Sequence, residues 1–325
     1  MLFQGKLDRD FNVMSFCCKD GAPTIAVKLE KDPAETIKNY IARKNEILKD
    51  CNNKYHDACA ACNVFMEKEW PQKDKFQIEH IVYGVTPAPC QARCIYCSQS
   101  VQTGTRRGYN PELDDAQHEL VFDTLAYLKE NDLLSPNIRW DIASGEITVH
   151  PYRQRIYDIV GNSNADWLTN CFLFDENIAK NLNANMYSNL LFSIDAGRSN
   201  TWHKIKGVDN FEKIKKNVID YTKAARHKEQ IVLKYLIIPE INTDFNELFA
   251  FVEFVIQAGV KRVVISKDRW GEKTEEALTA AAFLITVLVQ NGISPTFSFF
   301  TASEIEEVGK ISKTLFTQIY GGQNQ

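Results

Sequence analysis

The sequence predicts an α/β protein with a parallel sheet and a small, cysteine-rich region at its N-terminus. Between residues 77 and 300, strand-like segments alternate with amphipathic segments typical of helices. Such alternation implies parallel strands joined by right-handed crossovers. Residues 1–76 hold five of the nine cysteines, and residues 301–325 read as a helix with a tail. We therefore expect an N-terminal extension, a core and a C-terminal helix.

One helix is expected in the N-terminal region, at residues 33–50. Ile37, Tyr40 and Leu48 recur there at helical spacing. Asp32 stands before Pro33, an order typical of a helix N-terminus. The opening residues, MLFQG, resemble the remnant of an expression tag, so we give them no weight in the fold.

The core is expected to begin with a strand at residues 76–86, where apolar and polar residues alternate. A polar, turn-rich stretch at residues 100–112 precedes a helix at 113–132. Strands then alternate with helices to the end of the chain. The strands are expected at 138–143, 165–171, 188–197, 230–239, 261–266 and 295–300, and the helices at 150–162, 175–184, 210–227, 244–259, 275–292 and 303–315.

The composition excludes several classes of protein. With 325 residues, 44% hydrophobic and 25% charged, the chain is typical of globular proteins. A net charge of −4 forces no basic surface for nucleic acid. No apolar run is long enough to cross a bilayer, and no secretory signal opens the sequence. We expect a cytoplasmic protein without a membrane partner, whose clustered cysteines bind metal rather than form disulfides.

The stretch CQARCIYC carries the strongest chemical signal. It follows the first core strand and spaces Cys90, Cys94 and Cys97 as CxxxCxxC, with Tyr96 before the last cysteine. Three thiolates on one tight loop suit a [4Fe-4S] cluster, because a structural zinc site needs four ligands. A cluster held by three cysteines leaves one iron open to a substrate or cofactor. A zinc site or a disulfide loop is the alternative.

Together with motifs at later strand ends, this spacing resembles the radical S-adenosylmethionine (SAM) superfamily. The resemblance implies a partial (β/α)6 TIM-like barrel whose chemistry lies at the C-terminal ends of the strands. It also implies that SAM chelates the open iron through its amino and carboxylate groups. The reduced cluster then cleaves SAM to methionine and a 5′-deoxyadenosyl radical. A flavodoxin- or ferredoxin-like protein is the implied electron donor.

Two strand-end motifs match positions that bind SAM in this superfamily. Ser144, Gly145 and Glu146 end the second strand and resemble a GGE motif that receives the SAM ammonium, with Ser in place of the first Gly. An ordinary turn between strand and helix is the alternative. Ser193 and Asp195 end the fourth strand, where polar side chains bind the SAM ribose or carboxylate. Their alternative role is to cap the next helix.

Three further residues are expected to contact SAM by the same resemblance. Lys234 in the fifth strand matches a basic residue aimed at the SAM carboxylate, provided that the strand register points it inward. The sixth strand is expected to offer apolar side chains and backbone to the adenine near Ile265. Tyr96 is expected to pack near the adenine edge, or to shield the cluster.

Candidates for a catalytic role are few. His150 and Tyr152 follow the Ser144–Glu146 turn, at the end of the barrel where we expect substrate. Cys171 ends the third strand, and its alternative role is a buried structural thiol. The six histidines show no ligand spacing.

The N-terminal cysteines suggest a second metal site. Cys17 and Cys18 are adjacent in a loop with glycine and proline, and Cys59 and Cys62 are spaced as CxxC. Four sulfurs from these segments would complete a second iron–sulfur cluster or a zinc site. Reduced, buried thiols are the alternative. In the superfamily, auxiliary-cluster cysteines usually follow the barrel, whereas no cysteine follows Cys171 here.

The leading functional hypothesis is therefore an enzyme, an oxidoreductase or a transferase. Its radical would abstract hydrogen from a substrate not yet identified, which is a peptide, a glycan or another small molecule. The alternative is an iron–sulfur electron-transfer or metal-binding protein that does not cleave SAM. Formation of 5′-deoxyadenosine distinguishes the two.

Overall fold

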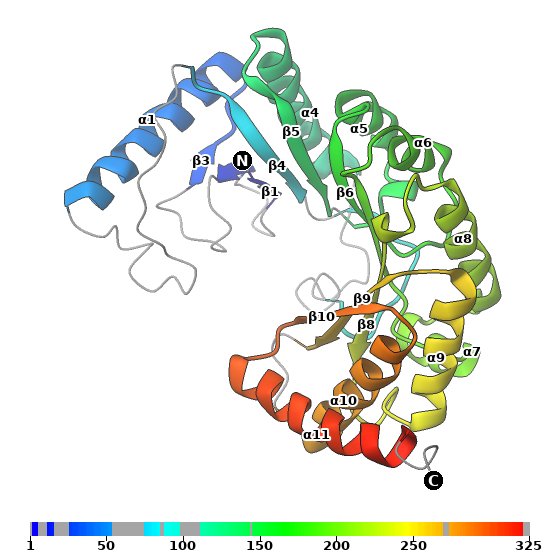
Figure 1. Cartoon of the computed structure of the whole chain (residues 1–325). Helices are drawn as coiled ribbons and strands as arrows, with labels where there is room; N and C mark the ends of the chain where they lie inside the picture. The colour runs from blue at the N-terminus through cyan, green and yellow to red at the C-terminus, as the bar shows by residue number, and fades with distance from the viewer. Residues whose placement is uncertain are drawn as a thin grey trace. The chain divides into compact units, whose positions relative to one another are not determined.

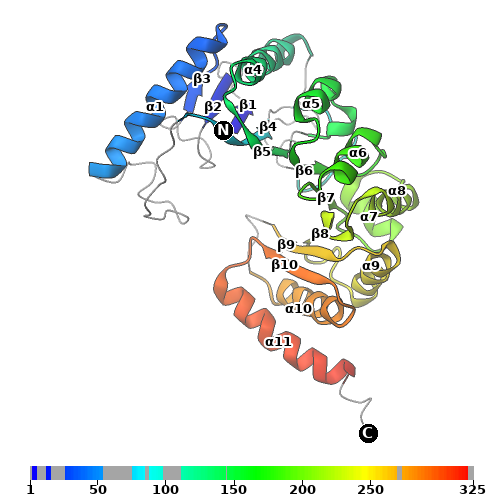
Figure 2. The same ribbon diagram turned by 45° about the horizontal axis from the view of Figure 1, so that its top comes forward.

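The computed structural model divides into two compact units, which we describe separately (Figures 1 and 2). Unit 1 comprises Met1–Pro89 and Gln102–Ala165, and unit 2 comprises Cys90–Val101 and Asp166–Gln325. The structure describes residues 2–5, 12–15, 26–53, 75–84, 88–97, 111–143, 145–268 and 273–320. Cys17, Cys18, Cys59, Cys62 and Ser144 lie outside the described residues. Within the described part of the chain, no helix has the length and apolar character needed to cross a bilayer.

Unit 1 contains a sheet of five strands in the order β5-β4-β1-β2-β3. Strand β4 runs parallel to both β5 and β1, whereas β2 pairs antiparallel with β1 and β3. Leu2–Gly5 therefore belong to the sheet, and our expectation that the opening residues have no weight in the fold is wrong. The strands are β1 (Leu2–Gly5), β2 (Asn12–Ser15), β3 (Ala26–Lys28), β4 (Ile78–Gly84) and β5 (Leu134–Ile142).

The helices of unit 1 bury their apolar faces on one another and on this sheet. Helix α1 contacts both α4 and β3, and its buried residues Ile37, Tyr40 and Ile47 recur at helical spacing. The Asp32 side chain accepts from the backbone N–H of Ala34 at 2.9 Å, next to Pro33 in the first turn. The helices are α1 (Pro33–Asn53), α4 (Pro111–Glu130), the short 3-10 helix η2 (Ile147–Val149) and α5 (Arg153–Val160).

Unit 2 contains a parallel sheet in the order β10-β9-β8-β7-β6. Strand β8 reads IVLKYLI and is buried on both faces, as expected of a central parallel strand, with Lys234 as its one charged residue. The strands are β6 (Asn164–Thr169), which begins at the boundary of the units, β7 (Asn189–Ser193), β8 (Ile231–Ile237), β9 (Arg262–Lys267) and β10 (Ser294–Ser298).

Helices follow each strand of unit 2, and α10 packs against β8, β9 and β10. The expected α/β fold is confirmed, because β4 and β5 in unit 1 and β6 to β10 in unit 2 are parallel within each unit and alternate with helices. One helix, α7, lies between the strand expected at 188–197 and the helix expected at 210–227, where we predicted no helix. The helices are α6 (Glu176–Ala184), α7 (Ser199–Lys206), α8 (Phe211–Ala224), the 3-10 helix η3 (Lys228–Gln230), α9 (Phe245–Ala258), α10 (Glu275–Gln290) and α11 (Ala302–Tyr320).

Candidate cofactor-binding site

The cysteine loop of unit 2 is fixed to the C-terminal end of α7. The backbone N–H of Arg93 donates to the Lys206 carbonyl at 2.8 Å, and that of Ile95 donates to the Ile205 carbonyl at 3.0 Å. The last carbonyls of a helix lack partners within the helix, so the loop satisfies them. Helix α7 ends at Gly207, whose left-handed φ of 69° suits glycine. The helix terminus thus positions the residues between Cys90 and Cys97.

The three cysteines of this loop form no disulfide with any described residue, and each is partly exposed. Among the described residues, no three His, Cys, Asp or Glu side chains are grouped to bind a single metal ion. A cubane cluster needs no such group, because its irons occupy separate corners and each takes its own cysteine. Three reduced thiols on an anchored loop therefore fit a cluster with three protein ligands.

A buried polar network lies beside the cysteine loop. Lys206, only 1% exposed, places its Nζ 2.5 Å from both the Asp195 Oδ2 and the Tyr96 hydroxyl. The Tyr96 hydroxyl also donates to Asp195 Oδ2. The other carboxylate oxygen, Oδ1, accepts from the Leu236 N–H at 2.8 Å. Asp195 is fully buried and has a left-handed φ of 55°, so the backbone as well as the side chain is constrained.

The charges of this network support one another. Burial lowers the pKa of Lys206, but the carboxylate of Asp195 and the thiol of Cys94 outweigh burial and raise it overall. The lysine is therefore cationic at neutral pH. Burial, followed by the charge of Asp195, raises the pKa of Tyr96 well above its ordinary value, so its hydroxyl stays a donor. Burial raises the pKa of the Cys94 thiol, and the ammonium of Lys206 opposes that rise.

The sheet register places Lys234 on the same side as this network. Lys234 on β8 pairs with Ser193 on β7, the predicted ribose-binding serine. Burial lowers the pKa of Lys234; the Asp195 charge opposes that shift and the Lys206 charge adds to it. The Lys234 ammonium also lies 5.7 Å from the centre of the Phe299 ring. The register that the sequence left open thus directs Lys234 toward Asp195.

A cavity of about 330 Å³ opens at the C-terminal ends of β8 and β9. Its lining includes Ile95 and Tyr96 of the cysteine loop, Ile238 and Pro239 after β8, and Lys267 at the end of β9. Ile265, which we expected near adenine, is fully buried two residues before Lys267 and does not line the cavity. The cavity joins the loop to the strand ends at which parallel α/β folds bind ligands.

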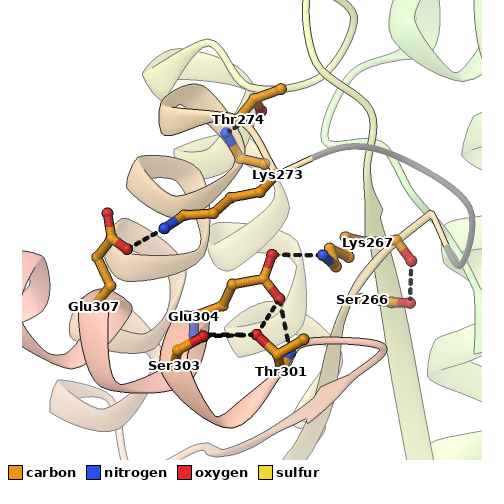
Figure 3. A network of polar contacts seen from close by, with 9 residues as sticks. Ser266, Lys267, Lys273, Thr274, Thr301, Ser303, Glu304 and Glu307 are labelled. Carbon is orange, nitrogen blue, oxygen red and sulfur yellow. Dashed lines mark hydrogen bonds and ion pairs between the residues drawn. The ribbon is translucent and has the colours of Figure 1, made fainter.

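The N-terminus of α11 is tied to the end of β9 (Figure 3). Lys267 Nζ lies 2.5 Å from Glu304 Oε1, and Lys273 Nζ lies 2.5 Å from Glu307 Oε2. Glu304 also accepts from the backbone N–H of Thr301 at 2.7 Å, while the Thr301 hydroxyl accepts from the Glu304 N–H at 3.3 Å. This reciprocal pair is a capping box. The Glu304 carboxylate also neutralises the Lys267 ammonium, so Lys267 presents a paired rather than a free charge at the cavity.

In unit 1, the predicted glycine–glutamate turn packs against the residues that precede Cys90. A Cβ added at Gly145 would lie 2.7 Å from the Ala88 Cβ and 2.8 Å from the Pro89 carbonyl oxygen. The Glu146 N–H donates to that carbonyl at 2.9 Å. The Glu146 carboxylate is fully buried and accepts from the Thr148 hydroxyl at 2.7 Å. It also accepts from the Thr148 backbone N–H at 3.2 Å, and this contact caps η2. Close approach of two backbones explains the glycine here.

His150 belongs to a buried aromatic cluster of unit 1. Its ring centre lies 4.9 Å from that of His118, which in turn lies 5.0 Å from that of Tyr152. The Tyr83 hydroxyl is 3.0 Å from His118 Nδ1. Burial, reinforced by His118, lowers the pKa of His150 to about 3, so its ring is neutral at physiological pH. The catalytic roles suggested for His150 and Tyr152 stay predictions.

Two residues near the cysteine loop were missed by sequence reasoning. One is Lys206, because we expected no helix at its position. The signals for that helix were the spacing of Trp202 and Ile205, the basic last turn and Gly207 as its terminator. The other is Asn170, whose Nδ2 lies 3.6 Å from the Cys90 Sγ. No sequence pattern pointed to it, because the contact joins residues 80 positions apart.

Comparison with known structures shows that the fold is similar to that of SuiB from Streptococcus suis. SuiB aligns with a TM-score of 0.50 and 12% identity over 86% of this chain and 57% of its own. The structure of SuiB bound to S-adenosylmethionine aligns with a TM-score of 0.50 and 12% identity, over 90% of this chain and 61% of SuiB. A radical SAM methyltransferase from Sphaerobacter thermophilus aligns with a TM-score of 0.44 and 14% identity, over 64% of this chain and 63% of the methyltransferase.

The likenesses to SuiB show that the two chains share a fold. At such low identity they establish the fold alone. The chain spans 57 to 61% of the length of SuiB. No protein-family model and no curated protein matches the sequence.

Proposed function

We propose that this protein is a radical SAM enzyme. The observation that carries the proposal is the position of Tyr96. It stands within the cysteine spacing and also lines the cavity at the ends of β8 and β9. A cofactor that reaches the loop therefore has a partly apolar space directly beside it. The fold likeness to SuiB, a protein that binds SAM, agrees with this reading.

Cys90, Cys94 and Cys97 would hold the cluster. When bound, a [4Fe-4S] cluster supplies the electron that cleaves SAM into methionine and a 5′-deoxyadenosyl radical. The protein's own contribution is to hold and enclose the reactants. Hydrogen bonds from Arg93 and Ile95 to α7 fix the loop, and fixed geometry of this kind lowers the entropic cost of bringing reacting groups together.

The SAM molecule would be bound by residues of the cysteine loop and of the strand ends. Ile95 and Ile238 offer apolar surface to the adenosyl group, and Lys234 offers a cation to the carboxylate. Ser193 remains the proposed ribose ligand. Asp195 already has Lys206, Tyr96 and Leu236 as partners, so its main task here is to hold Tyr96 and Lys206 in place. Gly145 and Glu146 remain the proposed receptors of the SAM ammonium.

The wider biochemical setting belongs to the same proposal. The substrate is a peptide, a glycan or another small molecule, and it would donate the hydrogen that the radical abstracts. A flavodoxin- or ferredoxin-like protein in the cytoplasm would supply the electron. The N-terminal cysteines would hold a second iron–sulfur cluster or zinc, which has no open position once four ligands are bound.

Product analysis tests the proposal against its alternative, an electron-transfer or metal-binding protein. The full chain is reconstituted anaerobically with iron and sulfide, reduced with dithionite and given SAM. We expect 5′-deoxyadenosine and methionine from the wild type and neither from the Cys90→Ala, Cys94→Ala, Cys97→Ala triple variant. Equal yields from both proteins would exclude the assignment of the loop.

A further inference from the structure

Asn170 reaches the cysteine loop from the end of β6. Its Nδ2 atom lies 3.6 Å from the Cys90 Sγ and 3.3 Å from the Gln91 Oε1. An amide nitrogen only donates hydrogen bonds, whereas a thiolate sulfur and a side-chain carbonyl accept them. The two contacts therefore direct the N–H groups of Asn170 toward the first cysteine of the loop and its neighbour.

The orientation of the Asn170 amide is fixed by its own backbone. Its Oδ1 atom accepts from the N–H of Phe172 at 2.9 Å. Because an N–H can donate only to the oxygen of the amide, this contact assigns the two ends of the side chain. The nitrogen must then face Cys90 and Gln91.

The turn that carries Asn170 is constrained on both sides. Cys171 is fully buried and has a left-handed φ of 63°, which is unusual for a residue other than glycine. Its N–H donates to the Thr169 hydroxyl at 3.0 Å, and its carbonyl accepts from the Asn217 side chain at 2.8 Å. Backbone held in a sparsely populated conformation by several contacts is typical of functional sites. Asn170 is thus pre-oriented rather than adaptable.

We propose that Asn170 is a positioning residue for Cys90, which raises the reduction potential of the bound cluster through an N–H···S hydrogen bond. The inference rests on the proposed function, because it requires a cluster on Cys90. A hydrogen bond to a ligand sulfur withdraws negative charge and so favours the reduced cluster. The contact with Gln91 holds the Cys90 end of the loop, as α7 holds Arg93 and Ile95.

Redox titration of the reconstituted full chain, followed by electron paramagnetic resonance, tests this role. Asn170→Asp keeps an oxygen for the Phe172 N–H but loses the donor, and Asn170→Ala loses the donor without adding charge. Asn185→Asp is the matched control, because Asn185 Oδ1 accepts from the Tyr187 N–H at 2.9 Å in the same local pattern. Asn185 precedes β7, at the opposite strand end from the loop.

We expect both Asn170 variants to bind as much iron as the wild type and to show lower midpoint potentials than the wild type and the Asn185→Asp control. A lower potential in Asn170→Asp alone would trace the effect to the added charge and overturn the proposal. Unchanged potentials in cluster-containing variants that still form 5′-deoxyadenosine would overturn this inference but not the proposed function.

A wild type that binds no cluster would overturn both the inference and the proposed function. If Asn170→Ala does not fold, Asn170→Leu, which also lacks donor and charge, replaces it.

Discussion

The Nζ atom of Lys206 lies 2.5 Å from the hydroxyl oxygen of Tyr96, so a buried cation meets the aromatic residue of the CxxxCxxC loop. The same lysine contacts the loop through its backbone carbonyl, which accepts from Arg93. A single residue of α7 thus fixes both the main chain and a side chain of the loop. Stability of the fold and geometry of the proposed cluster site are therefore coupled at Lys206.

Replacing Lys206 by Met should destabilise the protein strongly. The change keeps much of the volume but leaves Asp195 buried without its cation, and breaking a buried ion pair costs about 3–5 kcal/mol. Urea denaturation measures the loss in the free energy of unfolding. Lys216→Met is the control, because its pair with Asp220 is largely exposed and should be worth less than about 1 kcal/mol. Adding Asp195→Asn to Lys206→Met should recover part of the loss, and a Lys206→Met protein of wild-type stability would refute the buried pair.

Gly207→Ala should disturb the cysteine loop beyond its effect on stability. A Cβ at this position would lie 2.9 Å from the Arg93 Cβ, and the φ of 69° is unfavourable for alanine. Gly292→Ala is a matched control, with a φ of 66° and nothing within 4 Å of its Cβ. Both should lose about 1–2 kcal/mol from the left-handed backbone. Only Gly207→Ala should lose more and retain less iron after reconstitution, and equal behaviour of the two would contradict the close contact with the loop.

His150 should make the protein less stable in mild acid. Burial, together with His118, lowers the pKa of His150 from 6.5 to about 3 in the folded state. Between these values the unfolded chain binds a proton that the folded chain does not. Stability should therefore fall by about 1.4 kcal/mol per pH unit as the pH drops below 6.5. The free energies of unfolding at pH 7 and pH 5 measure the effect. His150→Phe should lose less of its stability over this interval than the wild type does.

The N-terminal cysteines should bind metal independently of the CxxxCxxC loop. Metal analysis of the Cys90, Cys94 and Cys97 triple-alanine variant should find about four irons or one zinc still bound. Adding Cys59→Ala and Cys62→Ala should remove them. A folded, metal-free triple variant would mean that Cys17, Cys18, Cys59 and Cys62 are ordinary thiols.

The sequence predicted the core of the fold because its strands are apolar and its helices are periodic. Strand β8 is an example, since IVLKYLI between two turn segments has no amphipathic period that suits a surface helix. The opening strand β1 was not predicted, because four residues are too few to show a periodic pattern that distinguishes a strand from a tag. Helix α7, with eight residues, was hidden by its polar first turn.

The cysteines of the candidate site were predictable because their spacing is local. The network around them was not, because it depends on side chains that meet only in the folded chain. Tyr96 and Asp195 are 99 residues apart, and Lys206 joins them from a third element. The direction of Lys234 depended on strand register, which the pairing of Ser193 with Lys234 supplies.

The most direct test of the central claim is the electron paramagnetic resonance spectrum of the reduced, reconstituted full chain with and without SAM. A cluster held by Cys90, Cys94 and Cys97 has one iron open to a ligand. We predict a [4Fe-4S]⁺ signal that shifts when SAM is added, and no SAM-responsive signal from the triple-alanine variant. A reduced wild type without this signal, or with one that SAM leaves unchanged, would contradict the account.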